Sequence, residues 1–301
     1  MKNSVILDKK VRRGERDMLV KREITCHTEY VRLKQVIVSS PRYMRIEKVI
    51  NETQKRYKKQ NINIDLALKQ HQYFVEVMKN HGVKVIEITP DPALNEQVFT
   101  RDIGFAIGEH VFIAKMASHI RIEETGHLKA FLAEEELPYH EVLIDSIEGG
   151  DVLIDDKKIW IGVSDRTTEA AIQGLRTQLP QYQIESVTLK EDILHLDCTF
   201  NIVAPDLALV YKDGMVKDDY NKLKANYQLI HVSAEEQFTL GTNVLSIGDK
   251  KVISLPENTQ VNQALVGRGY EVIEVPFDEI IKSGGSYRCC TLPIVRSHHA
   301  Q

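Results

Sequence analysis

Short runs of hydrophobic residues recur along the chain in pairs, and the two runs of each pair are separated by a turn rich in glycine, aspartate or proline. Such pairs are typical of β-hairpins. Four hairpins are predicted, with strands at residues 104–107 and 111–114, 152–154 and 159–163, 200–204 and 207–211, and 244–247 and 252–255. Their starting positions lie 48, 48 and 44 residues apart, which indicates an internal repeat.

The hairpins are followed by a helical stretch and a further strand. Residues 169–179 are one such helical stretch, and residues 258–267 lead into a strand at 271–275. A fifth unit begins at Cys289, but the chain ends after one strand. Its missing parts are predicted near the N-terminus. They are a strand at 35–39, a helix that contains Leu66, Tyr73, Phe74, Val77 and Met78, and a strand at 83–88.

In this arrangement the last strand pairs with the first and closes a ring. Closure removes the exposed edges that an open sheet would leave. The sequence therefore predicts an α/β fold, a five-bladed β/α propeller with pseudo-fivefold repeats. The alternative is an ordinary open α/β sheet whose spacing is coincidental. We expect a single domain at residues 31–301, preceded by a charged arm at residues 1–30 that includes the basic run 9–22.

Polar motifs occupy the same phase of each repeat, just before the first strand of the hairpin. In chain order they are Asp102, then Glu148 with Asp151, then His195 with Asp197, then Gly241-Thr242-Asn243, and finally Cys289. Equivalent positions in a closed ring point to one end of its axis. Residues spread over nearly 190 positions are therefore expected to meet in one pocket.

Composition sets mild limits on function. The 301 residues are 43% hydrophobic and carry a formal charge of −4, so the chain can bury a core but has no basic excess for nucleic acid. Four cysteines are too few for a disulfide framework. The N-terminus lacks an apolar signal region, and no apolar run reaches membrane-spanning length. A cytoplasmic protein with neither nucleic-acid nor membrane partners is expected. Its oligomeric state stays open, with a homodimer as one arrangement.

Five motifs suggest a family. They are Phe99-Thr100-Arg101-Asp102, Glu148-Gly149-Gly150-Asp151, the stretch from Gly162 to Thr168 with Arg166, His195-Leu196-Asp197, and Arg288-Cys289 followed by Pro293. In order and spacing they resemble the guanidine-modifying enzymes of the pentein superfamily. These five-bladed propellers include arginine deiminase, dimethylarginine dimethylaminohydrolase and the amidinotransferases. The resemblance covers about residues 30–296.

The resemblance implies a cysteine nucleophile acting on a cation. A guanidinium carbon is deactivated by resonance and charge, so a thiolate such as that of Cys289 suits the attack. His195 would protonate the departing amine and then activate water, and Glu148 would orient His195. Asp102 and Asp197 would hold the guanidinium through charge-assisted hydrogen bonds. No metal and no cofactor is expected.

Further residues are assigned by the same resemblance. Arg121 and Arg166 would bind the carboxylate of an amino acid substrate, Asp151 would receive its ammonium group, and Phe99 belongs to the substrate-binding motif. The arginine that deiminases carry a few residues before the cysteine has no counterpart at residues 282–284. The resemblance therefore accounts for only part of the binding of a substrate α-carboxylate.

Each candidate also has a purely structural interpretation. A cysteine at the start of an apolar strand is more often buried packing than a nucleophile. Cys290 would face the opposite way from Cys289 in an extended strand, so it is assigned to the core, as are Cys198 and Cys26. The glycine pair before Asp151 is compatible with a tight turn. The accompanying motifs favour the catalytic interpretation.

Substrate choice within the superfamily is less determined. An acid at Asp197 favours a guanidinium with N–H donors on both sides, as in arginine deiminase. The compact length and the pair Cys289-Cys290 instead resemble the dimethylarginine hydrolases. We therefore predict a hydrolase that converts arginine, or an N-substituted relative, to citrulline and ammonia or an amine through a covalent thiouronium. The alternatives are a dimethylarginine dimethylaminohydrolase proper, an amidinotransferase, and a non-catalytic module like the ribosome-binding factors of the superfamily.

Overall fold

The strands of the chain form five separate three-stranded sheets. The computed structural model describes residues 24–142 and 144–298. In each sheet the middle strand is antiparallel to one neighbour and parallel to the other. The orders are β15-β1-β2, β3-β4-β5, β6-β7-β8, β9-β10-β11 and β12-β13-β14. This repeated unit is the one that the periodic pattern predicts.

The bounds of the strands agree closely with those expected from the sequence. The strands are β1 (Leu33–Ser39), β2 (Lys84–Ile88), β3 (Gly104–Ile107), β4 (His110–Ile113), β5 (Tyr139–Glu141), β6 (Val152–Asp155), β7 (Lys158–Val163), β8 (Gln183–Thr188), β9 (Phe200–Ala204), β10 (Leu207–Val210), β11 (Gln228–His231), β12 (Leu245–Gly248), β13 (Lys251–Ser254), β14 (Glu271–Glu274) and β15 (Leu292–Arg296). All four predicted hairpins are confirmed. Asp156, Asp249 and Lys250 adopt positive φ in two of the turns, which fixes where those strands reverse.

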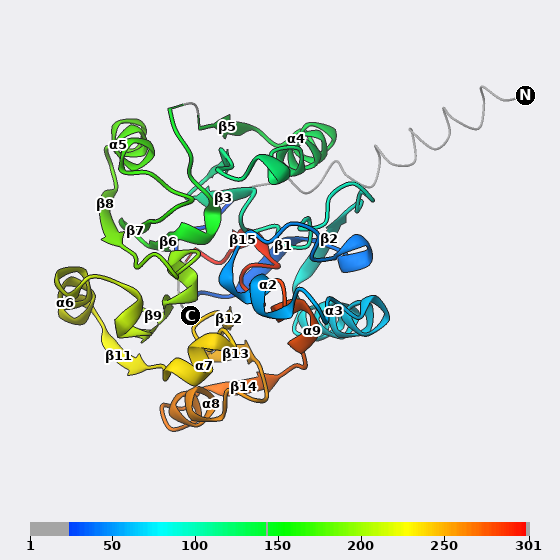
Figure 1. Cartoon of the computed structure of the whole chain (residues 1–301). Helices are drawn as coiled ribbons and strands as arrows, with labels where there is room; N and C mark the ends of the chain where they lie inside the picture. The colour runs from blue at the N-terminus through cyan, green and yellow to red at the C-terminus, as the bar shows by residue number, and fades with distance from the viewer. Residues whose placement is uncertain (1–23, 143, 299–301) are drawn as a thin grey trace, which may run out of the picture.

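The predicted pairing of the last strand with the first is also confirmed. β15 runs antiparallel to β1, with Ile37 opposite Leu292 and Val36 opposite Pro293. On its other side β1 is parallel to β2. The C-terminal strand therefore completes a sheet that begins near the N-terminus. Figure 1 shows the five units following one another around the molecule, with β1 and β15 side by side near its middle.

Helices connect the strands, and the longer ones lie on the periphery in Figure 1. They are α2 (Glu52–Tyr57), α3 (Ile64–Asn80), α4 (Glu124–Glu134), α5 (Glu169–Gln178), α6 (Lys217–Asn226), α7 (Ala234–Phe238), α8 (Thr259–Val266) and α9 (Asp278–Ile281). The side chain of Asn63 accepts a hydrogen bond from Leu66 N–H at the start of α3, and Thr168 does the same for Ala171 at the start of α5. The helices predicted from the apolar spacing are present. On α3, Phe74 is buried, whereas Leu66 and Tyr73 are exposed.

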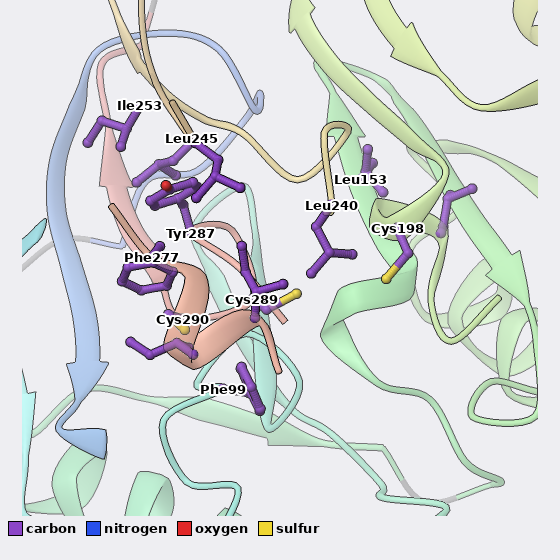
Figure 2. Packing of buried hydrophobic residues seen from close by; sticks show 14 of the residues in the cluster. Phe99, Leu153, Cys198, Leu240, Leu245, Ile253, Phe277, Tyr287, Cys289 and Cys290 are labelled. Carbon is purple, nitrogen blue, oxygen red and sulfur yellow. The ribbon is translucent and has the colours of Figure 1, made fainter. Parts of the chain in front are cut away.

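The core continues up to the loops that precede the first strands. Phe277 and Tyr287 stack with ring centroids 4.7 Å apart, and Cys290 is fully buried in the same cluster. Figure 2 shows the sulfur of Cys290 beside this cluster and the sulfur of Cys289 pointing another way. The core assignment of Cys290 is therefore confirmed. The reason given for it was wrong, because both cysteines lie in a turn and the strand β15 begins only at Leu292.

Most of the predicted N-terminal arm, residues 1–23, lies outside the described residues. Its last residues pack against the domain. Thr25 bridges to Val295, and Cys26 bridges to Gly108. Glu29 is 3% exposed. Within residues 24–142 and 144–298, no helix combines the length and the apolar character needed to cross a membrane.

Candidate active site

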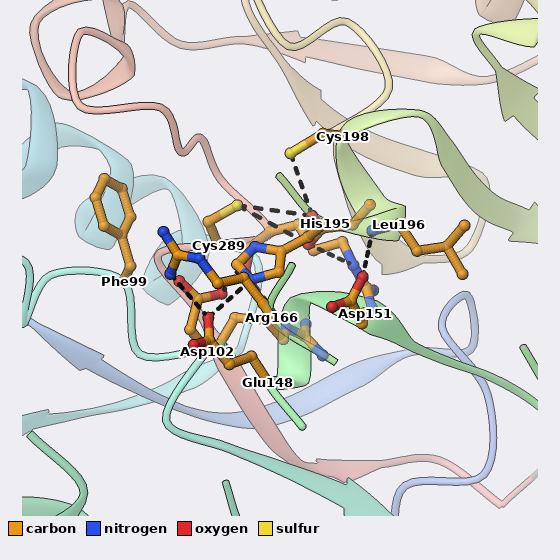
Figure 3. A network of polar contacts seen from close by, with 12 residues as sticks. Phe99, Asp102, Glu148, Asp151, Arg166, His195, Leu196, Cys198 and Cys289 are labelled. Atoms are coloured by element: carbon orange, nitrogen blue, oxygen red, sulfur yellow. Dashed lines mark hydrogen bonds and ion pairs between the residues drawn. The ribbon is translucent and has the colours of Figure 1, made fainter. Parts of the chain in front are cut away.

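Loops that lead into the first strands of the sheets carry the site. Asp102 precedes β3, and Glu148 precedes the 3-10 turn η3 (Gly149–Asp151) and β6. His195 and Asp197 lie at the 3-10 turn η4 (Leu196–Cys198) before β9, and Cys289 precedes β15. Figure 3 shows Asp102, Glu148, His195 and Cys289 converging on one another. The structure thus brings together the distant polar motifs that were predicted to meet.

Close packing explains the glycine pair between Glu148 and Asp151. A Cβ atom at Gly149 would lie 2.1 Å from the carbonyl oxygen of Arg101. One at Gly150 would lie 2.7 Å from Nδ1 of His195 and 2.9 Å from Oδ1 of Asp102. Since real Cβ atoms do not approach backbone oxygen so closely, only glycine permits this contact between the loops.

Cys289 is almost fully buried, with polar groups on two sides of its sulfur. The side-chain amide Nδ2 of Asn243 donates to Sγ at 3.2 Å. The carboxylate oxygens of Asp197 lie 3.9 and 3.8 Å from the same sulfur. Burial and the Asp197 carboxylate raise the pKa of the Cys289 thiol well above its ordinary value. The sulfur is therefore a neutral thiol at neutral pH when no cation is bound.

His195 lies between two carboxylates. Its Nε2 is 2.9 Å from Oε2 of Glu148, and its Nδ1 is 3.6 Å from Oδ1 of Asp102. Burial alone lowers the pKa of His195, but the charge of Asp102 and the hydrogen bond with Glu148 outweigh it and raise the pKa to about 9. Burial likewise raises the pKa of Glu148, whereas the hydrogen bond and charge of His195 and the charge of Arg166 lower it to about 2. The imidazole is therefore protonated at neutral pH.

Asp197 is held by a buried arginine. Nε of Arg288 lies 3.2 Å from Oδ2 of Asp197. The same guanidinium donates from Nη1 and Nη2 to the carboxylate of Glu29, and from Nη2 to the carbonyl of Val152 at 2.9 Å. Burial raises the pKa of Asp197, and the charge of Arg288 offsets part of that rise. Glu29 therefore connects the N-terminal segment to the site through Arg288.

Arg121 already has carboxylate partners. Its Nη1 donates to Oδ2 of Asp102 at 2.6 Å, and its Nε and Nη2 donate to Glu124. The other oxygen of Asp102, Oδ1, is buried and has no hydrogen-bond partner. Asp102 thus keeps one acceptor atom free beside His195. An added hydrogen-bond donor at this position would find a ready partner.

Arg166 and Asp151 flank the His195 loop. Arg166 donates from Nη1 to Oε2 of Glu148 at 3.3 Å and from Nη2 to the carbonyl of Ile50 at 2.9 Å. Asp151 accepts from the backbone N–H of Leu196 at 2.9 Å and from the hydroxyl of Ser164 at 2.8 Å. The bond from Leu196 to Asp151 holds the backbone directly after His195. The predicted binding of a substrate carboxylate by Arg166 and of an ammonium group by Asp151 stays a prediction.

A small cavity adjoins the sulfur. Its volume is about 10 Å³, which is room for about one water molecule. A larger cavity of about 310 Å³ shares part of its wall. The inner cavity is lined by six of the predicted site residues, namely Phe99, Asp102, Arg121, Arg166, His195 and Cys289. Glu148, Asp151 and Asp197 are not among its lining residues.

Other residues near the sulfur had no predicted role. Glu96 lines the inner cavity, and its Oε1 accepts from Nε2 of Gln54 at 2.9 Å and from the hydroxyl of Ser283 at 3.2 Å. Burial raises the pKa of Glu96 to about 7. Asn243 was noted only for its position before the fourth hairpin. That shared phase is the signal that connects it with the site.

One group of residues within the described parts of the chain has the spacing of a metal site. Ligand atoms of Asp102, Glu148 and His195 lie within 4.8 Å of one another, and all three residues are buried. The ring atom Nε2 of His195 already pairs with Glu148, and Arg166 donates to the same carboxylate. This set of contacts is also that of a hydrogen-bonded ion pair. The expectation that the site works without a metal stays a prediction.

Comparison with known proteins agrees with this geometry. Residues 40–296 match the family described as N,N dimethylarginine dimethylhydrolase, eukaryotic. The chain is 49% identical to the uncharacterized protein YkgA of Bacillus subtilis strain 168, over 90% of this chain and 95% of that protein. It is 28% identical to an arginine deiminase of Bacillus cytotoxicus, over 97% of this chain and 81% of the deiminase.

Solved structures show the same fold. The N-terminal domain of ArgZ, an arginine dihydrolase from the ornithine–ammonia cycle in cyanobacteria, was crystallised with its product and superposes with a TM-score of 0.82. The alignment covers 87% of this chain and 97% of that domain, at 21% identity. Such low identity supports the fold alone. The match of residues 40–296 shows that this chain belongs to the family described as N,N dimethylarginine dimethylhydrolase, eukaryotic. The relatives and the shared fold place it in the pentein superfamily of enzymes that modify guanidino groups.

Proposed function

We propose that this protein is a cysteine-dependent hydrolase of guanidino compounds. It would convert arginine, or an N-substituted arginine, to citrulline and ammonia or an amine. One observation carries the proposal: Cys289, His195 and Asp102 line a single cavity although they lie on loops that lead into three different sheets. A nucleophile, a proton donor and a free carboxylate oxygen therefore surround the same small space.

The reaction follows from the arrangement of these groups. The Cys289 thiolate attacks the guanidinium carbon and forms a C–S bond. His195 gives a proton to the departing nitrogen, the C–N bond breaks, and a thiouronium remains on the sulfur. Water then attacks the same carbon while His195 takes its proton. The C–S bond breaks and the second proton of the water is lost to solvent, which releases the ureido product and restores the thiolate.

Charge supports the activation of the sulfur by the substrate. Burial and the Asp197 carboxylate keep the Cys289 thiol protonated when the site is empty. Protonated His195 lies beside the cavity, and a bound guanidinium adds a second positive charge next to the sulfur. Both charges favour the thiolate, so the thiol loses its proton to solvent mainly when substrate is present. This limits side reactions of the free thiol.

Asp102 and Asp197 are proposed to hold the guanidinium. Oδ1 of Asp102, which has no hydrogen-bond partner, is placed to accept one N–H. The carboxylate oxygens of Asp197 lie 3.9 and 3.8 Å from the sulfur, and Arg288 pairs with Oδ2 and not with Oδ1. A planar cation between two carboxylates has its carbon directed at the nucleophile. The inner cavity is smaller than a guanidinium, so binding requires part of its wall to move.

A dimethylarginine dimethylaminohydrolase is the second candidate. The match of residues 40–296 to a family of that description favours it. Asp197 favours a guanidinium with few methyl groups, because a dimethylated nitrogen offers no N–H. Arg121 and Arg166 are proposed to contact the α-carboxylate of either substrate. An amidinotransferase differs from both in that an amine replaces water in the second half of the reaction.

The direct test is a substrate screen. The purified protein is incubated with arginine, methylarginines, agmatine and simple guanidines, and ureido product and released amine are measured. We expect ureido product from arginine or a methylarginine. Glycine or ornithine is added in parallel, since a new guanidino product would identify a transferase. A folded protein that forms neither product from any of these compounds contradicts the proposal.

Replacing Asp197 with asparagine tests the preference for N–H donors. Asn keeps the shape but loses the charge, so arginine binding is expected to weaken by about 1.5 to 3 kcal/mol. The measurement is KM and kcat/KM for arginine and for asymmetric dimethylarginine. The dimethylated substrate is the matched control, because it has fewer N–H groups to lose. Unchanged arginine kinetics would remove the reason for preferring a guanidinium with few methyl groups.

We also propose that the five sheets are the blades of a closed β/α propeller that occupies residues 31–301. The pairing of β1 with β15 supports closure, because it completes one sheet with strands from the two ends of the chain. Closure explains why loops from separate sheets share one cavity.

A further inference from the structure

Asn243 makes contacts with the nucleophile that no other side chain in the described parts of the chain duplicates. Its Nδ2 donates to Sγ of Cys289 at 3.2 Å and to the carbonyl oxygen of Asp197 at 3.3 Å. Its Oδ1 accepts from the backbone N–H of Arg288 at 3.1 Å and of Cys289 at 3.3 Å. The side chain is fully buried. One amide therefore contacts the sulfur of Cys289, the backbone of Cys289 and the backbone of Asp197.

These partners fix the orientation of the amide. The two backbone N–H groups can only donate, so the atom that faces them must be the carbonyl oxygen Oδ1. The carbonyl of Asp197 can only accept, so the atom that faces it must be Nδ2. The amide cannot flip without losing three of its four bonds. An N–H donor is therefore directed at the sulfur in either protonation state of Cys289.

Burial and Asp197 both oppose the thiolate. Burial disfavours a charge on the sulfur, and the Asp197 carboxylate, whose oxygens lie within 3.9 Å of Sγ, disfavours it further. Before substrate binds, the sulfur has one hydrogen-bond donor in reach among the described side chains, and it is Nδ2 of Asn243. A fixed donor that needs no reorganisation stabilises a charge as it develops in a buried site.

The position of Asn243 in the repeat is consistent with such a role. It lies just before β12, where the other sheets carry Asp102, Glu148, His195 and Cys289 before their first strands. Asn201 holds this loop in place by donating from Nδ2 to the carbonyls of Thr242 and Val244, both at 2.8 Å. The fourth unit thus contributes to the site like the others.

We propose that Asn243 is a catalytic residue whose side-chain N–H stabilises the thiolate of Cys289. The inference rests on the proposed role of Cys289 as the nucleophile. The amide does not transfer a proton. It holds the sulfur in position and favours its anion, which then attacks the guanidinium carbon.

The experiment uses two replacements with different losses. Asn243→Asp keeps an acceptor for the two backbone N–H groups and loses the donor. Asn243→Leu is neutral, similar in size, and loses both. If the donor acts on the thiolate, both variants raise the pKa of Cys289 by about 1 to 2 pH units. Alkylation of Cys289 by iodoacetamide at a fixed pH below that pKa then slows about 10- to 100-fold in both. Peptide mass spectrometry follows the reaction at that residue.

Thr242→Val is the matched control. Thr242 is as buried as Asn243, and its hydroxyl donates to the same carbonyl of Asp197 at 3.1 Å and not to the sulfur. Its alkylation rate is expected to stay within about twofold of the wild type. With substrate, the two Asn243 variants are expected to lose kcat about 10- to 100-fold with little change in KM.

Different results separate this inference from the proposed function. Slower alkylation in Asn243→Asp alone would mean that only the added negative charge acts, and slower alkylation in Asn243→Leu alone would mean that only the loop contacts matter. Either outcome overturns the role of the donor. A third result combines slower alkylation in both variants with a wild-type protein that turns over no guanidino compound. It would overturn the proposed reaction and leave the N–H to sulfur interaction intact.

Discussion

Cys289→Ser is expected to abolish turnover, whereas Cys290→Ser is expected to keep most of it. The reason is the direction of the two sulfurs. Cys289 lines the inner cavity, and its Sγ contacts Asn243 and Asp197. Cys290 is fully buried in the hydrophobic cluster that contains Phe277 and Tyr287. A serine hydroxyl at position 289 is a much weaker nucleophile towards a guanidinium carbon, so the rate falls to background.

The two variants are also expected to differ in stability, and here Cys290→Ser is the more impaired of the two. A hydroxyl at position 289 has the amide of Asn243 and the carboxylate of Asp197 as partners. A hydroxyl at position 290 is placed in an apolar environment, which costs about 1 to 3 kcal/mol when no partner is found. Turnover and urea unfolding of both variants check this. Loss of activity in Cys290→Ser with retention in Cys289→Ser would mean that the nucleophile is the other sulfur.

Activity is expected to fall at alkaline pH as His195 loses its proton. The pKa of His195 is raised from 6.5 to about 9 by Asp102 and Glu148 against the effect of burial. The protonated ring is the proposed acid for the leaving nitrogen, so kcat/KM drops as the pH rises through about 9. The Cys289 thiol gives the opposite slope, because more thiolate forms with rising pH. His195→Gln removes the acid and is expected to slow turnover about 10²- to 10⁴-fold.

Glu148→Gln tests whether His195 sets the pH at which kcat/KM falls, which is the alkaline limb of the profile. It keeps a hydrogen-bond acceptor for Nε2 of His195 but removes the charge that helps hold the proton. The limb should therefore move to lower pH. The kcat/KM profiles of the wild type and of Glu148→Gln decide this. A limb that stays at the same pH in both proteins would assign it to a group other than His195.

The same ion pair predicts how stability depends on pH. The folded pKa of His195 lies above its unfolded value, so its contribution is complete below about 6.5 and is lost as the pH rises through about 9. The folded pKa of Glu148 lies below its unfolded value, so its contribution is present above about 4.5 and is lost as the pH falls through about 2. Urea unfolding across this range should show both losses, and His195→Gln should lack the alkaline one.

Much of the fold follows from local patterns in the sequence. Paired apolar runs and turn residues located the four hairpins to within one or two residues, since strand and turn preferences act over a few positions. The repeat spacing also predicted that β15 pairs with β1, because an incomplete fifth unit needs a partner. The shared phase of Asp102, Glu148, His195 and Cys289 predicted that they would meet. One residue at the same phase, Asn243, was left without a role.

The directions of side chains and their distant partners depend on the tertiary structure. Sequence alone set the periodicity and the nucleophile candidate, and the same phase of the polar motifs in successive units predicted that the loops converge. Packing of separate units decided the rest. It turned the amide of Asn243 towards the sulfur and paired Arg288 with Glu29, 259 positions away. It also engaged Asp151 with the backbone of Leu196. Hydrogen bonds depend on the relative placement of two loops to within a fraction of an ångström, and only the packed core fixes that placement.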